Sequence, residues 1–318
     1  MYCTGMKDFA EKLRHRTLYS HVPMTEDGIA LADYLSAHFS RFDCAGWITR
    51  IRSGSVSVNG NTVTAPEYRL QKHDRIDYAL PDLPEPDADL SWRTLYEDAH
   101  LLVLEKSGNL CVHPTGPFYR HTLWHLAGSV YGDIKFVNRL DRETSGLIAA
   151  ARSRSVAALM DNGKCPFRKE YLALVSGIFD RPVRAEGFLI RDTESAVRKK
   201  KIFITDHPVG AAYETADTEL LPEKPGIRPG QSLVRAILHT GRQHQVRATL
   251  ASLGFPLIGD KLYGPDERIF LKIREQRITP EDIALLGMER QALHAAVLEF
   301  PHPVTGETIR CESPCPFL

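Results

Sequence analysis

The spacing of apolar residues in the first quarter of the chain predicts two helices followed by short strands. Apolar residues recur at helical intervals over residues 29–39 and again over 46–52. Residues 56–58 then alternate like a strand, and Asn59-Gly60 favours a tight hairpin turn with 61–64 as the returning strand. We therefore predict a small α+β unit with its core over residues 28–80.

A change of composition follows this unit. Residues 81–89 contain three prolines and four acidic residues, a composition typical of an extended, stiff linker. We predict an N-terminal domain over residues 1–80, a linker over 81–90 and a second domain over 91–318.

In the second domain, short apolar runs outnumber helical patterns. The runs at 101–104, 170–175 and 233–238 predict strands, and the patterns at 155–160 and 243–253 predict helices. Residues 222–229, rich in proline, are expected to form an exposed loop. Because strands and helices do not alternate regularly, we expect an α+β fold with a mixed, mostly antiparallel central sheet.

Overall charge gives no support for nucleic-acid binding. The 318 residues include 40 Lys plus Arg and 40 Asp plus Glu, so a basic surface must come from local clusters. The six cysteines are scattered without a CxxC pair, which makes a disulfide framework or a structural zinc site improbable. No apolar run reaches membrane-spanning length, and the polar N-terminus lacks a signal core. We expect a cytoplasmic protein without membrane association, with a monomer as the default.

The stretch over residues 138–147, Asn-Arg-Leu-Asp-Arg-Glu-Thr-Ser-Gly-Leu, is the first candidate for chemistry. It places Asp141 between Arg139 and Arg142, directly before an apolar run. A carboxylate beside permanent cations stays ionised, which suits nucleophilic or ion-pair work better than acid catalysis. A turn residue in a surface salt-bridge cluster is an equally good interpretation of this stretch alone.

The second candidate lies over residues 238–250, where a strand ends at Thr240-Gly241 and a helix is expected from about Gln243. Arg242, His244 and Arg247 would gather at the first turns of that helix, where free N–H groups favour anions. The spacing also places Gln243, His244 and Arg247 on one helix face. The alternative is an ordinary amphipathic helix with solvated arginines.

Two further features are weaker alone. Tyr171 alternates with Ala173 and Val175 in a predicted strand, so its ring could stack on a base, although a core tyrosine is the commoner case. The basic run Arg198–Lys201 is either a solvated loop or a clamp for phosphates. The chain contains no P-loop, GxGxxG, HExxH, DxDxDG or GxSxG motif, so neither a cofactor nor a metal is indicated.

In their order along the chain, several strings together resemble the RluA-type family of RNA pseudouridine synthases. The match extends from Leu95 to Glu307, and its strings are residues 94–106, 138–147, 169–177, 238–264 and 293–307. Two positions depart from the family pattern: Asn138 replaces the usual histidine, and Ser107-Gly108-Asn109 replaces the common Pro-Ala-Gly. Residues 28–80 resemble a small RNA-binding domain named after a ribosomal small-subunit protein.

The resemblance implies that uridine in RNA, ribosomal more than transfer RNA, is isomerised to pseudouridine without a metal or cofactor. It implies that Asp141 is the nucleophile or ion-pair partner of the ribose, that Arg247 pairs with it, and that Tyr171 packs on the uracil. Arg139 would fill the stack vacated by the flipped base. The expected RNA- or base-binding residues are Arg139, Arg142, Thr144, Arg242, His244, Gln245, Arg198, Lys199, Lys200 and Lys201, with Arg41, Arg50 and Arg52 in the first domain.

Two alternatives remain open at this point. A catalytically weak RNA-binding protein could retain the fold, and Asn138 favours this mildly. A glycosidase-like hydrolase would need a second carboxylate near Asp141, for which Asp260 and Glu143 are candidates.

Overall fold

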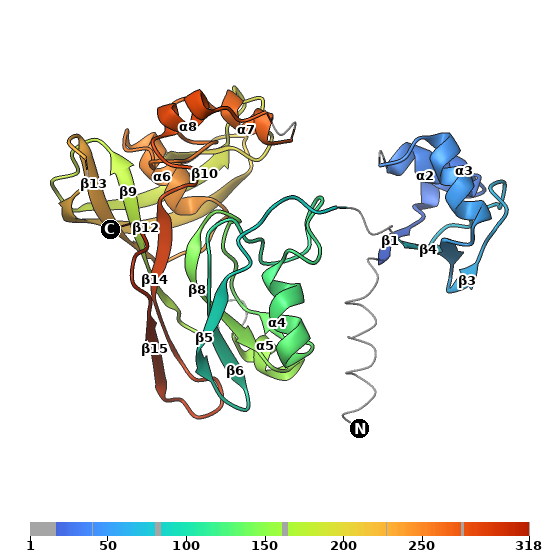
Figure 1. Ribbon diagram of the computed structural model, residues 1–318, viewed down its shortest axis with the longest axis horizontal. Helices are drawn as coiled ribbons and strands as arrows, with labels where there is room; N and C mark the ends of the chain where they lie inside the picture. Colours follow the sequence, from blue (N-terminus) through green and yellow to red (C-terminus); the bar gives the residue numbers. More distant parts are fainter. Residues whose placement is uncertain are drawn as a thin grey trace. The chain divides into compact units, whose positions relative to one another are not determined.

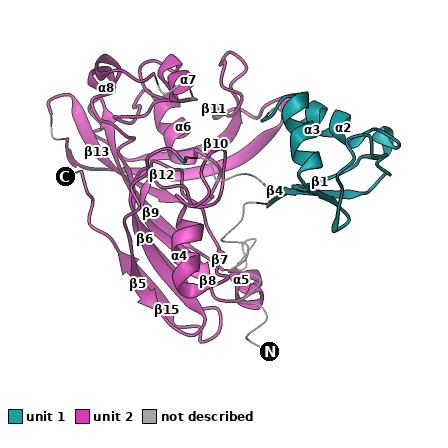
Figure 2. Ribbon diagram, turned by 45° about the vertical axis from the view of Figure 1, so that its right-hand side comes forward, with its two compact units in different colours: residues 1–85 teal, residues 86–318 magenta. Residues whose placement is uncertain are grey.

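The computed structural model describes residues 17–39, 41–79, 84–160, 165–226, 228–274 and 277–317. The chain divides into two compact units, Met1–Glu85 and Pro86–Leu318, coloured separately in Figure 2. Residues 1–16 and 80–83, which belong to the predicted N-terminal domain and linker, lie outside the described residues.

Unit 1 is a small α+β unit. Its elements are β1 (Thr17–His21), a 3-10 turn (Met24–Glu26), α2 (Leu31–His38), α3 (Cys44–Arg52), β2 (Val56–Val58), β3 (Asn61–Thr62) and β4 (Arg75–Ala79). The strands form an antiparallel sheet in the order β1-β4-β2-β3. At the β2–β3 turn, Asn59 and Gly60 have φ values of 51° and 81°. Two positive φ values are what a two-residue hairpin requires, which confirms the predicted turn.

Unit 2 contains a sheet of eleven strands among its described residues. Along the sheet the order is β11-β10-β12-β13-β9-β14-β8-β6-β5, with β15 on β14 and β7 on β8. The β14–β8 pair is parallel, and the other pairs are antiparallel. This confirms the expected α+β class with a mixed, mostly antiparallel sheet. The elements are β5 (Trp92–Glu97), β6 (Leu101–Lys106), α4 (Leu123–Tyr131), β7 (Lys135–Phe136), β8 (Ser145–Ala151), α5 (Arg154–Met160), β9 (Arg168–Ser176), β10 (Val183–Arg191), β11 (Lys201–Ile204), β12 (Tyr213–Pro225), β13 (Gln231–Leu238), α6 (Gln245–Ser252), α7 (Arg268–Arg274), α8 (Pro280–Leu286), β14 (Leu293–Pro301) and β15 (Thr308–Glu312).

Helices cover different parts of this sheet. In Figure 1, α4 and α5 lie beside β5, β6 and β8, whereas α6, α7 and α8 lie near β9 to β13. Strand β8 is buried along its whole length, since Ile148 and Ala150 pack in one core cluster and Leu147 and Ala149 pack in another. A strand buried on both faces has no polar face, which explains the continuous apolar run in the sequence.

Glycine is required where β8 meets β14. Gly146 has φ 108°, and a Cβ added there would lie 2.2 Å from the carbonyl oxygen of Ala295 on β14. Only a residue without a side chain permits this close approach of two backbones. The contact fixes the start of β8, and with it the loop that carries Asp141.

Two predicted boundaries are wrong. Residues 222–225, expected in a loop, continue β12 and pair with β13, with a register shift between Pro222 and Lys224. The pairing of β12 with β10 ends at the Val183–Leu220 pair, so residues 222–225 have β13 as their one neighbouring strand in the described sheet. A proline has no N–H to donate, and at these positions none is needed on the side that faces away from β13. Helix α6 begins at Gln245 instead of Gln243, because His244 has φ 60° and cannot belong to a right-handed helix.

The Ser107-Gly108-Asn109 departure has a local structural role. The hydroxyl of Ser107 donates to the carbonyl of Asp89 at 2.5 Å, and the amide of Asp89 donates to the carbonyl of Asn109 at 3.3 Å. These bonds join Asp89, in the last part of the predicted linker, to the segment after β6, so this part of the linker belongs to unit 2. Gly108 lies under the Arg290 side chain, where a Cβ would come within 2.5 Å of its atoms.

Candidate active site

Asp141 lies on the loop between β7 and β8. Hydrogen bonds to the backbone of this loop fix its position. The carbonyl of Arg142 accepts hydrogen bonds from the amide of Leu110 at 3.0 Å and from the buried ammonium of Lys106 at 3.1 Å. The amide of Thr144 donates to the carbonyl of Asp141 at 3.1 Å, closing a turn. Asp141 is therefore presented by a rigid loop, not by a solvated surface turn.

Arg247, on α6, bridges two carboxylates. Its Nη1 donates to Oδ2 of Asp141 at 2.6 Å, while its Nε and Nη2 donate to Asp260 at 2.7 and 2.8 Å. The side chain of Asp260 is fully buried, whereas that of Asp141 is 27% exposed. Asp260 also accepts hydrogen bonds from the backbone amides of Leu262 and Tyr263. Asp260 thus anchors the guanidinium, and Arg247 in turn aims Asp141.

Electrostatics keep Asp141 ionised. Burial by itself raises the pKa of this carboxyl, but the charge of Arg247, the nearby His244 and the Arg247 hydrogen bond together lower the pKa below its usual value. The carboxylate of Asp141 is therefore negatively charged where it lines the pocket.

Tyr171, on β9, is 8% exposed and lies in the same core cluster as Ala173 and Val175, which confirms the predicted strand face. Burial, and secondarily the negative charge of Asp141, raise the pKa of its phenol. Its hydroxyl has no hydrogen-bond partner among the described residues. Tyr171 therefore presents a neutral phenol and a flat ring to the pocket.

His244 lies immediately before α6 and close to Asp141. Its Nε2 is 3.9 Å from Oδ2 of Asp141, and its Nδ1 lies 3.0 Å from the hydroxyl of Tyr263. That hydroxyl accepts a hydrogen bond from the amide of Lys201, so its own proton is available for Nδ1. Burial, reinforced by the charge of Arg247, lowers the pKa of His244 to about 4, and the imidazole is neutral at pH 7.

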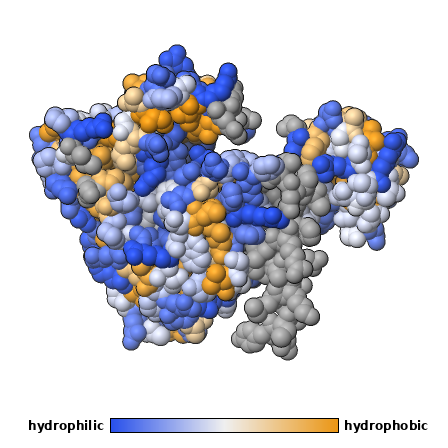
Figure 3. Space-filling view, in the orientation of Figure 1, coloured by the Kyte–Doolittle hydropathy of each residue, from blue (hydrophilic) through white to orange (hydrophobic). Residues whose placement is uncertain are grey.

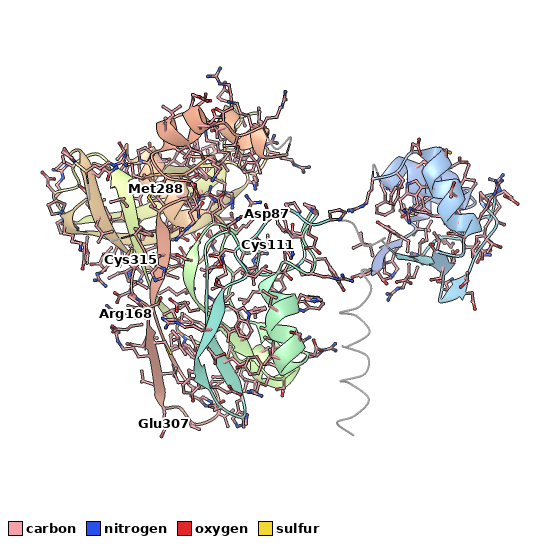
Figure 4. All side chains as sticks on the ribbon, in the orientation of Figure 1. Asp87, Cys111, Arg168, Met288, Glu307 and Cys315 are labelled. Carbon is pink, nitrogen blue, oxygen red and sulfur yellow. The ribbon has the colours of Figure 1, made fainter. Side chains whose placement is uncertain are left out.

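These side chains open into a pocket of about 810 Å³. Its basic lining residues include Arg139, Arg142, Lys169, Lys199 and Arg242, which approach from different strands and loops. A second segment, residues 111–118, forms part of the lining, and Cys111 of this segment is labelled in Figure 4. The pocket combines the ionised carboxylate of Asp141 and the Lys261-paired carboxylate of Glu143 with several cations, an arrangement expected for a polyanionic substrate.

Comparison with known proteins identifies the family. A family model described as RNA pseudouridylate synthase matches residues 100–252. The "Ribosomal large subunit pseudouridine synthase D" of Zymomonas mobilis is 30% identical over 286 residues, covering 84% of each chain. The chain belongs to the RNA pseudouridylate synthase family. This confirms the resemblance recognised in the sequence and the expected enzyme class, an isomerase.

Other relatives agree with this assignment. The "RNA pseudouridine synthase 2, chloroplastic" of Arabidopsis thaliana is 28% identical over 338 residues, covering 91% of this chain and 78% of that protein. The solved structure of human RNA Pseudouridylate Synthase Domain Containing 1 has a TM-score of 0.56 and 24% identity, covering 74% of this chain and 88% of that one. The latter likeness confirms the fold of a pseudouridine synthase.

Two of the expected RNA-binding residues, Thr144 and Gln245, need correction because they are buried. Thr144 is buried and its hydroxyl accepts from Gln291 at 2.6 Å. Gln245 is buried and its amide side chain holds the backbone of the 240–242 turn and β12. Lys200 and Lys201 are neutralised by Glu267 and Glu214. Thr144 and Gln245 stabilise the protein from within and are not accessible to RNA. Lys200 and Lys201 keep partly exposed side chains, and their binding to RNA stays a prediction.

Of the remaining candidates, His244 is buried but lines the pocket, and the others are at least partly accessible. Arg139, Arg198 and Arg242 are exposed, and Arg142 stacks over Phe118 with its guanidinium carbon 5.4 Å from the ring centroid. In unit 1, Arg41 and Arg52 are exposed, and Arg50 stacks over Phe42 at 3.9 Å. Because Gln243 and His244 precede α6, they do not share a helix face with Arg247, contrary to the prediction.

Asn138, which stands where the family usually has histidine, makes a hydrogen bond to the backbone. Its Oδ1 accepts a hydrogen bond from the amide of Ala149 on β8 at 2.8 Å. The Asn138 side chain therefore provides the acceptor for the Ala149 amide of β8 and ties the segment before Asp141 to this strand.

Pocket residues missed by the sequence analysis are mainly Lys169, Phe118, Phe270 and Ile273. Lys169 stands two residues before Tyr171 on one strand, so the alternation that placed Tyr171 could have placed it too. The other three belong to loops and a short helix, where no pattern indicated the pocket. Among the described residues, no cluster of three or more His, Cys, Asp or Glu could hold a metal ion, and no helix is long and apolar enough to span a membrane.

Proposed function

We propose that this chain isomerises specific uridines in large-subunit ribosomal RNA to pseudouridine in the pocket around Asp141. The observation that carries this proposal is a single available carboxylate, Asp141, aimed by Arg247 and placed beside the phenol of Tyr171. The names of relatives such as the Zymomonas mobilis protein support the choice of RNA.

The reaction breaks the bond between N1 of uracil and C1′ of ribose, and forms a bond between C5 and C1′. The proton on C5 must leave, and N1 must gain a proton, so the change is an isomerisation without net hydrolysis. Asp141 acts on the electron-poor C1′, either as nucleophile or as ion-pair partner, for which an ionised carboxylate is suited. Tyr171 packs on the free uracil while it turns and can relay a proton.

The target base must leave its stack before it can react, at a cost of about a few kcal/mol. Arg139, two residues before Asp141 and exposed at the pocket, is suited to fill the vacated space and contact phosphate. Arg142, Lys199 and Arg242 line the same pocket and supply further phosphate contacts.

Unit 1 serves as a separate RNA-binding domain in this proposal, with Arg41, Arg50 and Arg52 as its contacts. The protein acts as a cytoplasmic monomer and uses no metal or cofactor. These assignments rest on the resemblance and on the accessible arginines of unit 1.

Pairing of the remaining acids disfavours the hydrolase alternative. A glycosidase of the usual kind needs two carboxylates at the bond that it cleaves. Asp260 is fully buried with both oxygens bound, and Glu143 is paired with Lys261 at 2.8 Å. Neither is free to activate water.

The test uses purified protein and an unmodified transcript of large-subunit ribosomal RNA. Carbodiimide treatment and primer extension should reveal new stops at one or a few uridines, and chromatography should detect no free uracil. Release of uracil would establish the hydrolase, and binding of the transcript without new stops would establish the catalytically weak RNA-binding protein.

A further inference from the structure

Helix α7 supplies an apolar part of the pocket that the roles above leave unused. Phe270 and Ile273 line the pocket, and Figure 3 shows apolar surface in the region of α7 and α8. Phe270 packs partly against the main core cluster of unit 2, and the rest of its ring is available to the pocket. Neither residue has a role in the chemistry at Asp141.

The helix is held firmly in place. Ile269 is buried, and Glu267 just before the helix accepts from Lys200 at 2.6 Å and from Ser195 at 2.9 Å. On the other side, Lys272 donates to Asp282 at 2.7 Å. These bonds connect α7 to the loop before β11 and to α8, so the ring of Phe270 occupies a defined position.

A cation rests on that ring. The ammonium of Lys199 lies 4.4 Å from the ring centroid of Phe270. Its neighbours Lys200 and Lys201 are paired with carboxylates, whereas Lys199 has no ion pair in the described part of the chain. The contact between an unpaired ammonium and an aromatic ring is weak. A phosphate binds the ammonium more strongly and can draw it away from the ring.

We propose that Phe270 and Lys199 form a subsite for an unpaired nucleotide adjacent to the target uridine, a role that rests on the proposed function. When RNA binds, the ammonium of Lys199 leaves the ring for a backbone phosphate, and the exposed ring then stacks with the base. The flexible stem of lysine permits this movement, while the anchored helix keeps the ring in place. Stacking on an aromatic ring accepts any base, so this subsite adds affinity without reading sequence.

Two pairs of variants test the subsite. Phe270→Leu keeps apolar packing but removes the flat ring, and Phe270→Tyr keeps the ring. The control Leu271→Ala changes a neighbouring residue of the same helix that is 41% exposed and absent from the pocket lining. Lys199→Met removes the cation, and its control is Lys224→Met, which removes an exposed lysine that is absent from the pocket lining.

The probe is fluorescein-labelled hexauridylate, with binding followed by anisotropy at several salt concentrations. Phe270→Leu should raise Kd about fivefold or more, and Phe270→Tyr should restore it. Lys199→Met should reduce the salt slope by about 0.7, the value for one phosphate contact on a single strand. Both controls should stay within about twofold of the wild type.

Equal Kd values for wild type and Phe270→Leu, or an unchanged salt slope for Lys199→Met, overturn the subsite. On the ribosomal transcript, Phe270→Leu should raise KM while kcat stays within about twofold, because the contact is made equally in the bound and transition states. A loss confined to kcat also overturns it. Weakened hexauridylate binding in a chain that forms no pseudouridine would refute the proposed reaction while leaving the subsite standing.

Discussion

The two carboxylates bound by Arg247 should lose different amounts of stability on substitution. Asp260 has no exposed side-chain surface and accepts four hydrogen bonds, two from Arg247 and two from backbone amides. Asp260→Asn replaces one acceptor oxygen by an NH2 group, which then faces the N–H donors of Arg247 or of the backbone. The buried guanidinium of Arg247 also keeps Asp141 as its one charged partner among the described residues. Breaking a buried ion pair in this way costs about 3–5 kcal/mol.

Asp141→Asn should cost far less stability. It removes one charge-assisted hydrogen bond at a side chain that is 27% exposed, and Arg247 keeps its bidentate pair with Asp260. We expect a loss of about 1–2 kcal/mol. The difference separates a carboxylate that holds the site together from one that acts on substrate.

Hydrogen exchange measured by mass spectrometry reports on unit 2 alone, which a global unfolding curve of a two-unit chain does not. Peptides from α6 and β14 should show an opening free energy lowered by about 3–5 kcal/mol in Asp260→Asn and by about 1–2 kcal/mol in Asp141→Asn. If Asp260→Asn cost less than Asp141→Asn, the anchoring role of Asp260 would be refuted.

Three other changes have definite expected results. Gly146→Ala should not accumulate as a folded protein, because its Cβ would lie 2.2 Å from the Ala295 carbonyl; gel filtration and circular dichroism check this. His244 has a pKa of about 4 when folded, below its usual 6.5, so unfolding takes up a proton in this window and stability falls as pH drops from 6.5 toward 4. His244→Gln should therefore flatten the loss of the opening free energy of α6 peptides between pH 6.5 and pH 4.5, measured by hydrogen exchange; an equally steep loss would contradict the neutral imidazole. Asn138→Leu leaves the Ala149 amide without its acceptor and should lower the opening free energy of β8 peptides in hydrogen exchange by about 1–3 kcal/mol, and no loss would argue against this role.

Local features of the fold were predictable because their causes are local. The run at Leu147–Ala151 gave a buried strand, and Asn59-Gly60 gave a hairpin because both residues tolerate positive φ. The pairing of Asp141 with Arg247, 106 residues apart, was expected only from the family resemblance. No periodicity in the chain contains that information.

Other features depend on contacts between distant segments and were therefore missed or wrong. The run Arg198–Lys201 looks uniform in sequence, yet Glu267 neutralises Lys200 and leaves Lys199 unpaired, and this partner lies 67 residues away from Lys200. Thr144 looked like a polar loop residue, but the insertion of β14 beside β8 brings Gln291 over it and buries it. Both outcomes depend on which distant segments pack together, and the pattern of a single sequence does not reveal this.

The most direct test of the catalytic assignment compares the wild type with Asp141→Asn on the large-subunit ribosomal transcript. Pseudouridine is mapped by carbodiimide primer extension, and RNA affinity is measured in parallel by filter binding. We predict that the variant forms no detectable pseudouridine while its Kd for RNA stays within about fivefold of the wild type. Pseudouridine formation at an unchanged rate would contradict the assignment of Asp141 as the group that acts on the ribose.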